Sequence, residues 1–206
     1  MSGFARRAGR DTMSVVMSFP TEYREKLLAT IDTVDTALVG RAIAWMKETR
    51  DAQGAIFVAG NGGSAATAAH FVCDMVKGAS LGKAARFRIV ALGQNLPTHT
   101  AYANDLSYAD ALVEELKNFA RPGDLYMAIS GSGNSPNVVR AMEFANHLGC
   151  RTLALTGRDG GQLGKLAQLN IHVPEAHMGR IEDAHHVICH MMCYCFMEQA
   201  GMAAAE

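Results

Sequence analysis

The sequence has no surplus of basic residues, since 19 lysines and arginines face 20 aspartates and glutamates, for a formal net charge of −1. Nucleic acids and anionic membranes are held nonspecifically by a positive field, and this balance provides none. Long apolar runs are also missing, because none approaches the roughly 18 to 20 residues that a membrane-spanning helix needs. We therefore expect no nucleic-acid partner and no membrane partner.

Paired cysteines are absent as well. The five cysteines are an odd number, and none of them shows Cys-x-x-Cys spacing, so neither a disulfide framework nor a zinc ribbon is favoured. The opening segment carries basic residues, but its apolar stretch is too short for a secretory signal. We expect a cytoplasmic protein in which residues 1–20 form a flexible leader before the first helix.

Short apolar runs alternate with helical patterns from residue 54 onward. The runs read AIFVAG, RFRIVAL, DLYMAIS, RTLALTG and LNIHVP. Such alternation is typical of a parallel sheet covered on both faces, and right-handed crossovers make it a doubly wound three-layer α/β fold. Helices are predicted at residues 21–35, 36–49, 64–77, 99–120, 137–148, 162–167 and 180–197. We see no repeat and no second domain, so residues 21–206 are predicted to form one domain that includes an N-terminal helical pair.

Two of the strand-to-helix loops are rich in glycine and serine. GNGGS covers residues 60–64, and SGSGNSPN covers residues 130–137. Glycines let the backbone approach an anion closely, and the following helix offers free N–H groups with a partial positive charge. Each loop alone could be a plain connection, but the serine cluster in the second favours phosphate binding. The candidate phosphate-binding residues in these loops are Gly62, Gly63, Ser64, Ser130, Gly131, Ser132 and Ser135.

Neither loop has the features of a nucleotide site. No Gly-Lys-Ser/Thr follows, as a Walker motif requires, and neither loop reads G-x-G-x-x-G with an acidic residue downstream. A sugar phosphate is therefore the expected ligand rather than a nucleotide.

Histidine and carboxylate side chains recur on two of the predicted helices. HFVCDMV places His70 and Asp74 four residues apart, on one face where both can chelate a metal. IEDAHHVICH places Glu182 and His190 about 12 Å apart along the helix axis. His186 lies between them on the same stripe and is a rival ligand. Imidazole and carboxylate are competent zinc ligands, although a packed core helix with locally bonded histidines remains the alternative.

Four motifs resemble those of the sugar isomerase (SIS) domain family, in order over residues 21–198: GNGGSAATAAHF, AISGSGNSPNVVRAMEFA, LALTGRDGGQLGKLA and RIEDAHHVICH. Within that family the phosphoheptose isomerase subfamily is most similar. The resemblance implies a five-stranded flavodoxin-like sheet and a homotetramer with shared active sites. It also places Asn61, Ser64 and Asp105 at substrate positions, and Gly131 where the family's phosphate loop has a threonine.

The resemblance further implies a zinc site and an isomerase reaction. The matching metal positions are His70, Asp74, Glu182 and His190, where Asp74 stands for a glutamate and Glu182 for a glutamine. By this analogy Asp74 removes the C1 proton of sedoheptulose 7-phosphate and His190 is the acid, with Glu182 as an alternative base. Two other readings stay open: a non-catalytic tetramer of the replication-initiator-associating kind, against which the retained His190 argues, and an isomerase of another sugar phosphate.

Overall fold

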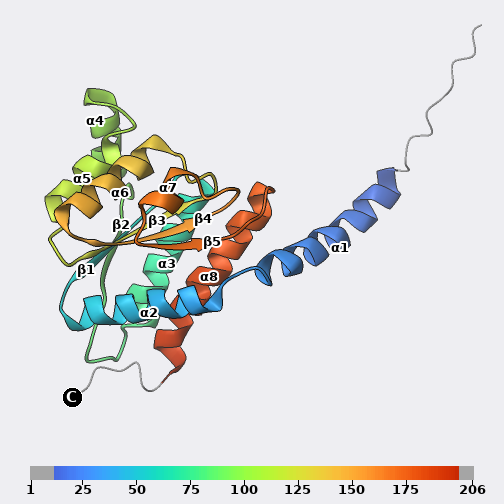
Figure 1. Ribbon diagram of the computed structural model, residues 1–206, viewed down its shortest axis with the longest axis horizontal. Coiled ribbons are helices and arrows are strands. Elements are labelled where there is room, and N and C mark those ends of the chain that lie inside the picture. Colours follow the sequence, from blue (N-terminus) through green and yellow to red (C-terminus); the bar gives the residue numbers. More distant parts are fainter. Residues whose placement is uncertain (1–11, 200–206) are drawn as a thin grey trace, which may run out of the picture.

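The computed structural model describes residues 12–199 (Figure 1). Its helices are α1 (Thr12–Ile31), α2 (Thr36–Asp51), α3 (Gly63–Cys73), α4 (Leu96–Asp105), α5 (Ala111–Phe119), α6 (Pro136–Leu148), α7 (Gly161–Leu166) and α8 (Met178–Glu198), with a π-helical turn η1 (Asp74–Gly78) directly after α3. Its strands are β1 (Ala55–Ala59), β2 (Arg88–Ala91), β3 (Leu125–Ser130), β4 (Arg151–Thr156) and β5 (Leu169–His172).

All five strands pair in parallel, in the order β2-β1-β3-β4-β5. This confirms the predicted doubly wound sheet. The strand order reverses between β1 and β3, so the loops that follow these two strands diverge and leave a crevice between them. Both glycine–serine loops lie at this reversal point, which is where open α/β sheets bind their ligands.

The sheet is buried on both faces, as its apolar strands require. On one face α2, α3 and α8 pack against it around Met46, Phe71 and Ile188. On the other face α5 and α6 enclose Leu116 and Met142. Figure 1 shows these two layers and shows α1 extending away from the body of the molecule. Part of α1 nevertheless contacts α8, where the Tyr23 hydroxyl donates a 2.6 Å hydrogen bond to Asp183.

The first helix differs from its prediction at both ends. It begins at Thr12 rather than at residue 21, so the predicted leader is wrong for residues 12–20, while residues 1–11 lie outside the described part. Pro20 is inside the helix, in an exposed stretch where water can satisfy the carbonyl that the proline leaves unpaired. The helix ends at Ile31, because Asp35 caps α2 by accepting from the N–H groups of Ala37 and Leu38.

Two predicted helices are divided in the structure. The one expected at residues 99–120 is α4 and α5, separated by a turn in which the Ser107 hydroxyl donates to Asp110 at 2.6 Å. The one expected at residues 64–77 is α3 followed by the π turn, which begins at Asp74. Within residues 12–199, no helix is long and apolar enough to cross a membrane.

Candidate active site

The two glycine–serine loops line one pocket with a volume of about 280 Å³. Its walls are Asn61, Gly62, Gly63, Ser64, Ile129, Ser130, Gly131, Ser132, Ser135, Met178 and Glu182. The predicted loop residues therefore meet around one space. A larger hollow of about 450 Å³ lies at the opposite end of the sheet, beside Ala55, Arg88 and Asp124. It contains no predicted site residue, and ligands of such sheets bind at the carboxyl ends of the strands, so the smaller pocket is the candidate site.

The serine hydroxyls of the second loop are arranged to donate into the pocket. Ser130 Oγ accepts from the Gly133 N–H at 3.2 Å, and Ser132 Oγ accepts from the Asn134 N–H at 3.3 Å. A hydroxyl that accepts from the backbone keeps its own O–H for another acceptor. Ser135 is the N-cap residue of α6, yet its side chain makes no capping bond. Ser130 Oγ and Ser132 Oγ also lie 3.5 Å apart, where one hydroxyl can donate to the other. The other hydroxyl of this pair, the Ser135 hydroxyl and the start of α6 are thus available to a phosphate.

Glycine is required at position 133 of this loop. Gly133 has φ +64°, and a Cβ there would lie 2.1 Å from the carbonyl oxygen of Gly160. The phosphate loop is therefore pressed against the LTGRDGG segment after β4, and it could not keep its shape with a larger residue.

Asn61 joins the two loops instead of pointing freely at a ligand. Its Oδ1 accepts from Asn137 Nδ2 and from the Tyr108 hydroxyl, both at 2.8 Å, and its Nδ2 donates to Asn137 Oδ1 at 2.9 Å. Tyr108 was not anticipated from the sequence, because no local pattern connects it to the loop after β1. Asp105 is exposed at the end of α4 and does not line the pocket, so its substrate role stays a prediction.

Glu182 lies in the phosphate-loop pocket, against the start of α3. A Cβ at Gly63 would come within 2.7 Å of Glu182 Oε1, so the carboxylate sits directly over that glycine. The free N–H groups at a helix N-terminus favour a negative charge in such a position.

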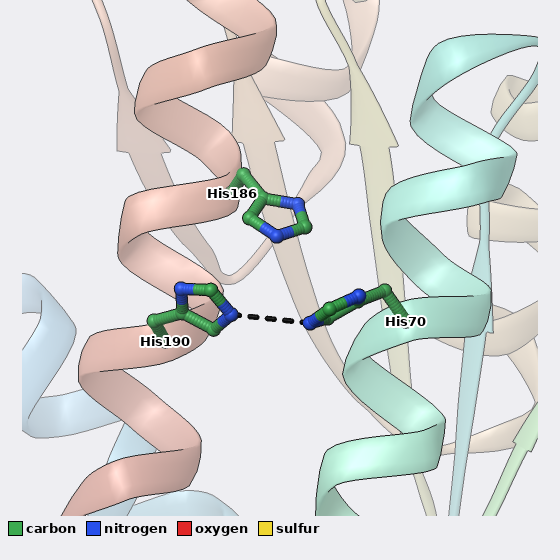
Figure 2. Close-up of side chains that lie close together, drawn as sticks. All are labelled: His70, His186 and His190. Atoms are coloured by element: carbon green, nitrogen blue, oxygen red, sulfur yellow. Dashed lines mark hydrogen bonds between the residues drawn. The ribbon is translucent and has the colours of Figure 1, made fainter.

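Three histidines form a second cluster farther along the same two helices. His70 on α3 and His186 and His190 on α8 have ligand nitrogens that all lie within 4.8 Å of one another. Figure 2 shows the three rings turned into the space between the helices. The Nε2 atoms of His70 and His190 are 3.2 Å apart, as the dashed line marks. At that distance one ring donates and the other accepts, so at least one is neutral.

Asp74 reaches this cluster despite its short side chain. Its Oδ2 lies 3.2 Å from His70 Nε2 and 3.6 Å from His190 Nε2. It also accepts a weak bond from the Cys193 thiol at 3.7 Å. Three of the four predicted metal ligands therefore come together. The fourth, Glu182, lies in the loop pocket instead. The residues whose ligand atoms all lie within 4.8 Å of one another are His70, His186 and His190, a group that contains His186 but neither Glu182 nor Asp74.

The electrostatics of the cluster favour neutral imidazole at its centre. Burial lowers the pKa of His186, and the neighbouring His190 and His70 lower it further. Neutral imidazole is the form that binds a metal. Burial, with Asp74 nearby, raises the pKa of the Cys193 thiol to about 12, so this sulfur is a packing group rather than a thiolate ligand.

Comparison with known proteins gives the chain close relatives. A sequence model described as SIS domain matches residues 21–157. The probable phosphoheptose isomerase of Thermoplasma volcanium is 39% identical over 172 residues, which cover 84% of this chain and 86% of that protein. The phosphoheptose isomerase of Citrifermentans bemidjiense is 39% identical over 152 residues, covering 74% and 79%. The structure of phosphoheptose isomerase GmhA from Neisseria gonorrhoeae superposes with a TM-score of 0.82 at 28% identity, covering 90% of this chain and 98% of that one.

Proposed function

This chain belongs to the SIS domain family and to its phosphoheptose isomerase branch, and on that premise we propose that it is a phosphosugar isomerase. Its reaction interconverts sedoheptulose 7-phosphate and a heptose 7-phosphate through an enediolate. The observation that carries the proposal is the meeting of two glycine–serine loops at the reversal point of the sheet, together with a histidine–carboxylate cluster on the α3–η1 segment and α8.

The phosphate of the substrate is assigned to the loop pocket. The hydroxyls of Ser130, Ser132 and Ser135 donate to its oxygens, and the partial positive charge at the start of α6 adds to the attraction. Among residues 12–199 of this chain no cation lines the pocket, so hydroxyl donors and the helix end carry the recognition within one chain.

The spacing between pocket and cluster supports a long sugar. Glu182, beside the phosphate loop, and His190, in the cluster, are about 12 Å apart along α8. An extended seven-carbon chain with bonds of about 1.5 Å spans roughly 8 to 10 Å from C1 to its phosphate. A seven-carbon sugar phosphate held at the loops would therefore bring C1 and C2 closer to the histidines than a five-carbon one, which supports the longer substrate.

Proton transfer is assigned to the cluster. Asp74 is the proposed base that takes the C1 proton and returns it to C2, and His190, within 3.6 Å of it, serves the neighbouring oxygen. Glu182 is the second candidate for the base, because its carboxylate lines the pocket.

The donor set also fits a zinc ion. His70, Asp74 and His190 offer two imidazoles and a carboxylate, the ligand types that zinc prefers, with donor atoms 3.2 to 3.6 Å apart. When bound, the metal would supply a positive charge that stabilises the enediolate oxygen.

The proposal extends to assembly and compartment. Several apolar side chains of α1 are exposed in the single chain, among them Met13, Val16, Met17 and Phe19. Burial of this surface in a tetramer with shared active sites would account for them. The compartment we propose is the cytoplasm.

The test is an isomerase assay with ketose phosphates of five, six and seven carbons, each with and without a chelator. We expect turnover of the seven-carbon substrate above the others, and a loss of rate when the metal is removed. Turnover of a shorter sugar alone would move the substrate assignment to that sugar. Tight binding without any turnover would favour the non-catalytic reading.

A further inference from the structure

The polar stripe of α8 offers three possible donors at intervals of one helical turn: Glu182, His186 and His190. Only two of them can meet His70 on α3, because one turn of helix rises about 5.4 Å. The centroid of the His186 ring lies 4.5 Å from that of His70 and 4.6 Å from that of His190. The His70 and His190 centroids are 5.2 Å apart, so the three rings form a compact triangle.

We propose that His186 is a metal ligand of this protein, that His70 and His190 are the other two imidazole ligands, and that Glu182 is not a ligand. The inference rests on the zinc site of the proposed function. It changes which residues of this chain hold the metal, because His186 takes the place of Asp74 in the donor set described above and of Glu182, which the resemblance implies as a ligand.

The spacing of the donor atoms suits a zinc centre. Ligand atoms around a tetrahedral zinc with bonds of about 2.0 to 2.1 Å lie about 3.3 Å apart. The Nε2 atoms of His70 and His190 are 3.2 Å apart, and the nearest nitrogen of His186 lies within 4.8 Å of both. Closing the triangle requires the His186 side chain to move toward the other two rings, which it already faces (Figure 2).

Glu182 is held elsewhere by the packing of the helices. Its carboxylate rests on Gly63 at the first turn of α3, whereas His70 is seven residues farther along that helix. Reaching the histidines would require Glu182 to leave the phosphate-loop pocket and cover about 6 Å along α8 to the level of His186, or about 12 Å to the level of His190.

The exchange of ligand has a chemical consequence. Three imidazoles satisfy the His₃ pattern of catalytic zinc, which keeps a further position for water or substrate. Asp74 is then not needed as a ligand and keeps its carboxylate for proton transfer. Glu182 stays in the pocket that receives the sugar phosphate.

The experiment measures zinc affinity of the full-length apoprotein by competition with a chromophoric chelator, without substrate. His186→Ala is expected to weaken zinc binding on the order of 100-fold or more, because loss of a residue that only hydrogen-bonds to a ligand can already weaken it by that factor. His190→Ala should behave alike. Glu182→Ala, which removes every donor atom of that side chain, should change the affinity less than about threefold, as should His147→Ala, which removes an exposed histidine of α6 as a matched control.

Cobalt(II) gives a second readout, because its visible absorption reports the ligand set. His186→Ala should alter the spectrum and Glu182→Ala should not. If His186→Ala does not fold by circular dichroism, His186→Leu, which keeps side-chain volume without a donor atom, replaces it. Weakened binding in Glu182→Ala with unchanged binding in His186→Ala would overturn the inference.

The inference and the proposed function fail separately. If His186→Ala keeps its zinc affinity and the wild type turns over its substrate normally, the ligand assignment is wrong and the proposed isomerase function is supported. If His186→Ala loses zinc affinity and the wild type turns over no ketose phosphate, the ligand assignment is supported and the proposed isomerase function is wrong. A wild type that binds no zinc or cobalt overturns the ligand assignment whatever the assay of turnover gives.

Discussion

Replacing Glu175 by glutamine should destabilise the protein by about 2 kcal/mol at neutral pH. Glu175 lies between β5 and α8, and its carboxylate accepts five hydrogen bonds. The donors are Arg180 Nε at 2.8 Å, Arg180 Nη2 at 3.1 Å, the Thr30 hydroxyl at 3.0 Å, and the backbone N–H groups of Ala176 and His177 at 2.7 and 2.8 Å. It therefore anchors α1 and the start of the site helix together.

The magnitude follows from what glutamine can still do. An amide keeps one acceptor oxygen, and its NH₂ group would face donors that the second carboxylate oxygen now satisfies. A hydrogen bond to a charged group contributes about 1.5 to 3 kcal/mol. The Glu175 and Arg180 side chains are only 17% and 15% exposed, so solvent replaces little of the loss. The same contacts, Arg180 first and then the His177 N–H, hold the pKa of Glu175 well below its ordinary value of 4.5.

The pH dependence has a definite sign. Because the folded pKa is lowered, the stabilisation by Glu175 is fully present above pH 4.5 and is lost as pH falls below it. At 1.36 kcal/mol per pH unit, a difference of about 2 kcal/mol disappears within about 1.5 units. Urea unfolding of wild type and Glu175→Gln should therefore differ at pH 7 and converge near pH 3.

A matched control separates this carboxylate from an ordinary surface acid. Glu114 pairs with Lys117 on the exposed side of α5, and Glu114→Gln should cost at most about 0.5 kcal/mol. Equal losses for the two variants, or a Glu175→Gln deficit that does not shrink on acidification, would show that the five contacts do not stabilise the fold as argued.

Three further predictions concern the loops and the assembly. Ser132→Ala with Ser135→Ala should weaken sugar-phosphate binding at least tenfold by calorimetry while the thermal midpoint stays within a few degrees, because neither hydroxyl caps a helix; unchanged affinity would remove this loop from the site. Gly133→Ala should lower the thermal midpoint more than Gly123→Ala does, since both glycines have positive φ but, of the two, only Gly133 would place its Cβ against a backbone oxygen. Equal midpoints for the two variants would refute this close approach. Light scattering at micromolar concentration should give a tetramer, and Phe19→Asp on α1 should lower its mass, whereas a monomeric wild type would contradict shared active sites.

The sheet and its loops were predictable because each strand and each loop depends on residues that are consecutive in the sequence. Continuous apolar runs such as DLYMAIS can only be buried on both faces, and the strand-end glycines mark the sharp turns. Helix ends were less accessible, since they depend on contacts such as the Asp35 cap and the Ser107–Asp110 bond, whose acids look like any other surface acid. The start of α1 at Thr12 was missed, and the helix continues through Pro20 because a helix breaker is tolerated in an exposed stretch.

The ligand set could not be chosen from the sequence. Glu182, His186 and His190 share one stripe, so their spacing alone fits any pairing with His70 and Asp74. The choice depends on how far α8 is shifted along α3, and that shift is a property of packing. The π turn that begins at Asp74 likewise has no pattern in the sequence that predicts it, although such turns occur frequently at functional sites.

Two glycines of the α3–η1 segment lie against side chains of α8, one near each end of the contact. A Cβ at Gly63 would lie 2.7 Å from Glu182 Oε1, and a Cβ at Gly78 would lie 2.2 Å from Met197 Cε. Both atoms are the ends of flexible side chains, so a larger residue at either glycine would make that side chain move. At Gly63 the side chain that would move is Glu182, so a substitution there would displace the carboxylate from the phosphate-loop pocket while His70 kept its place beside the histidines of α8.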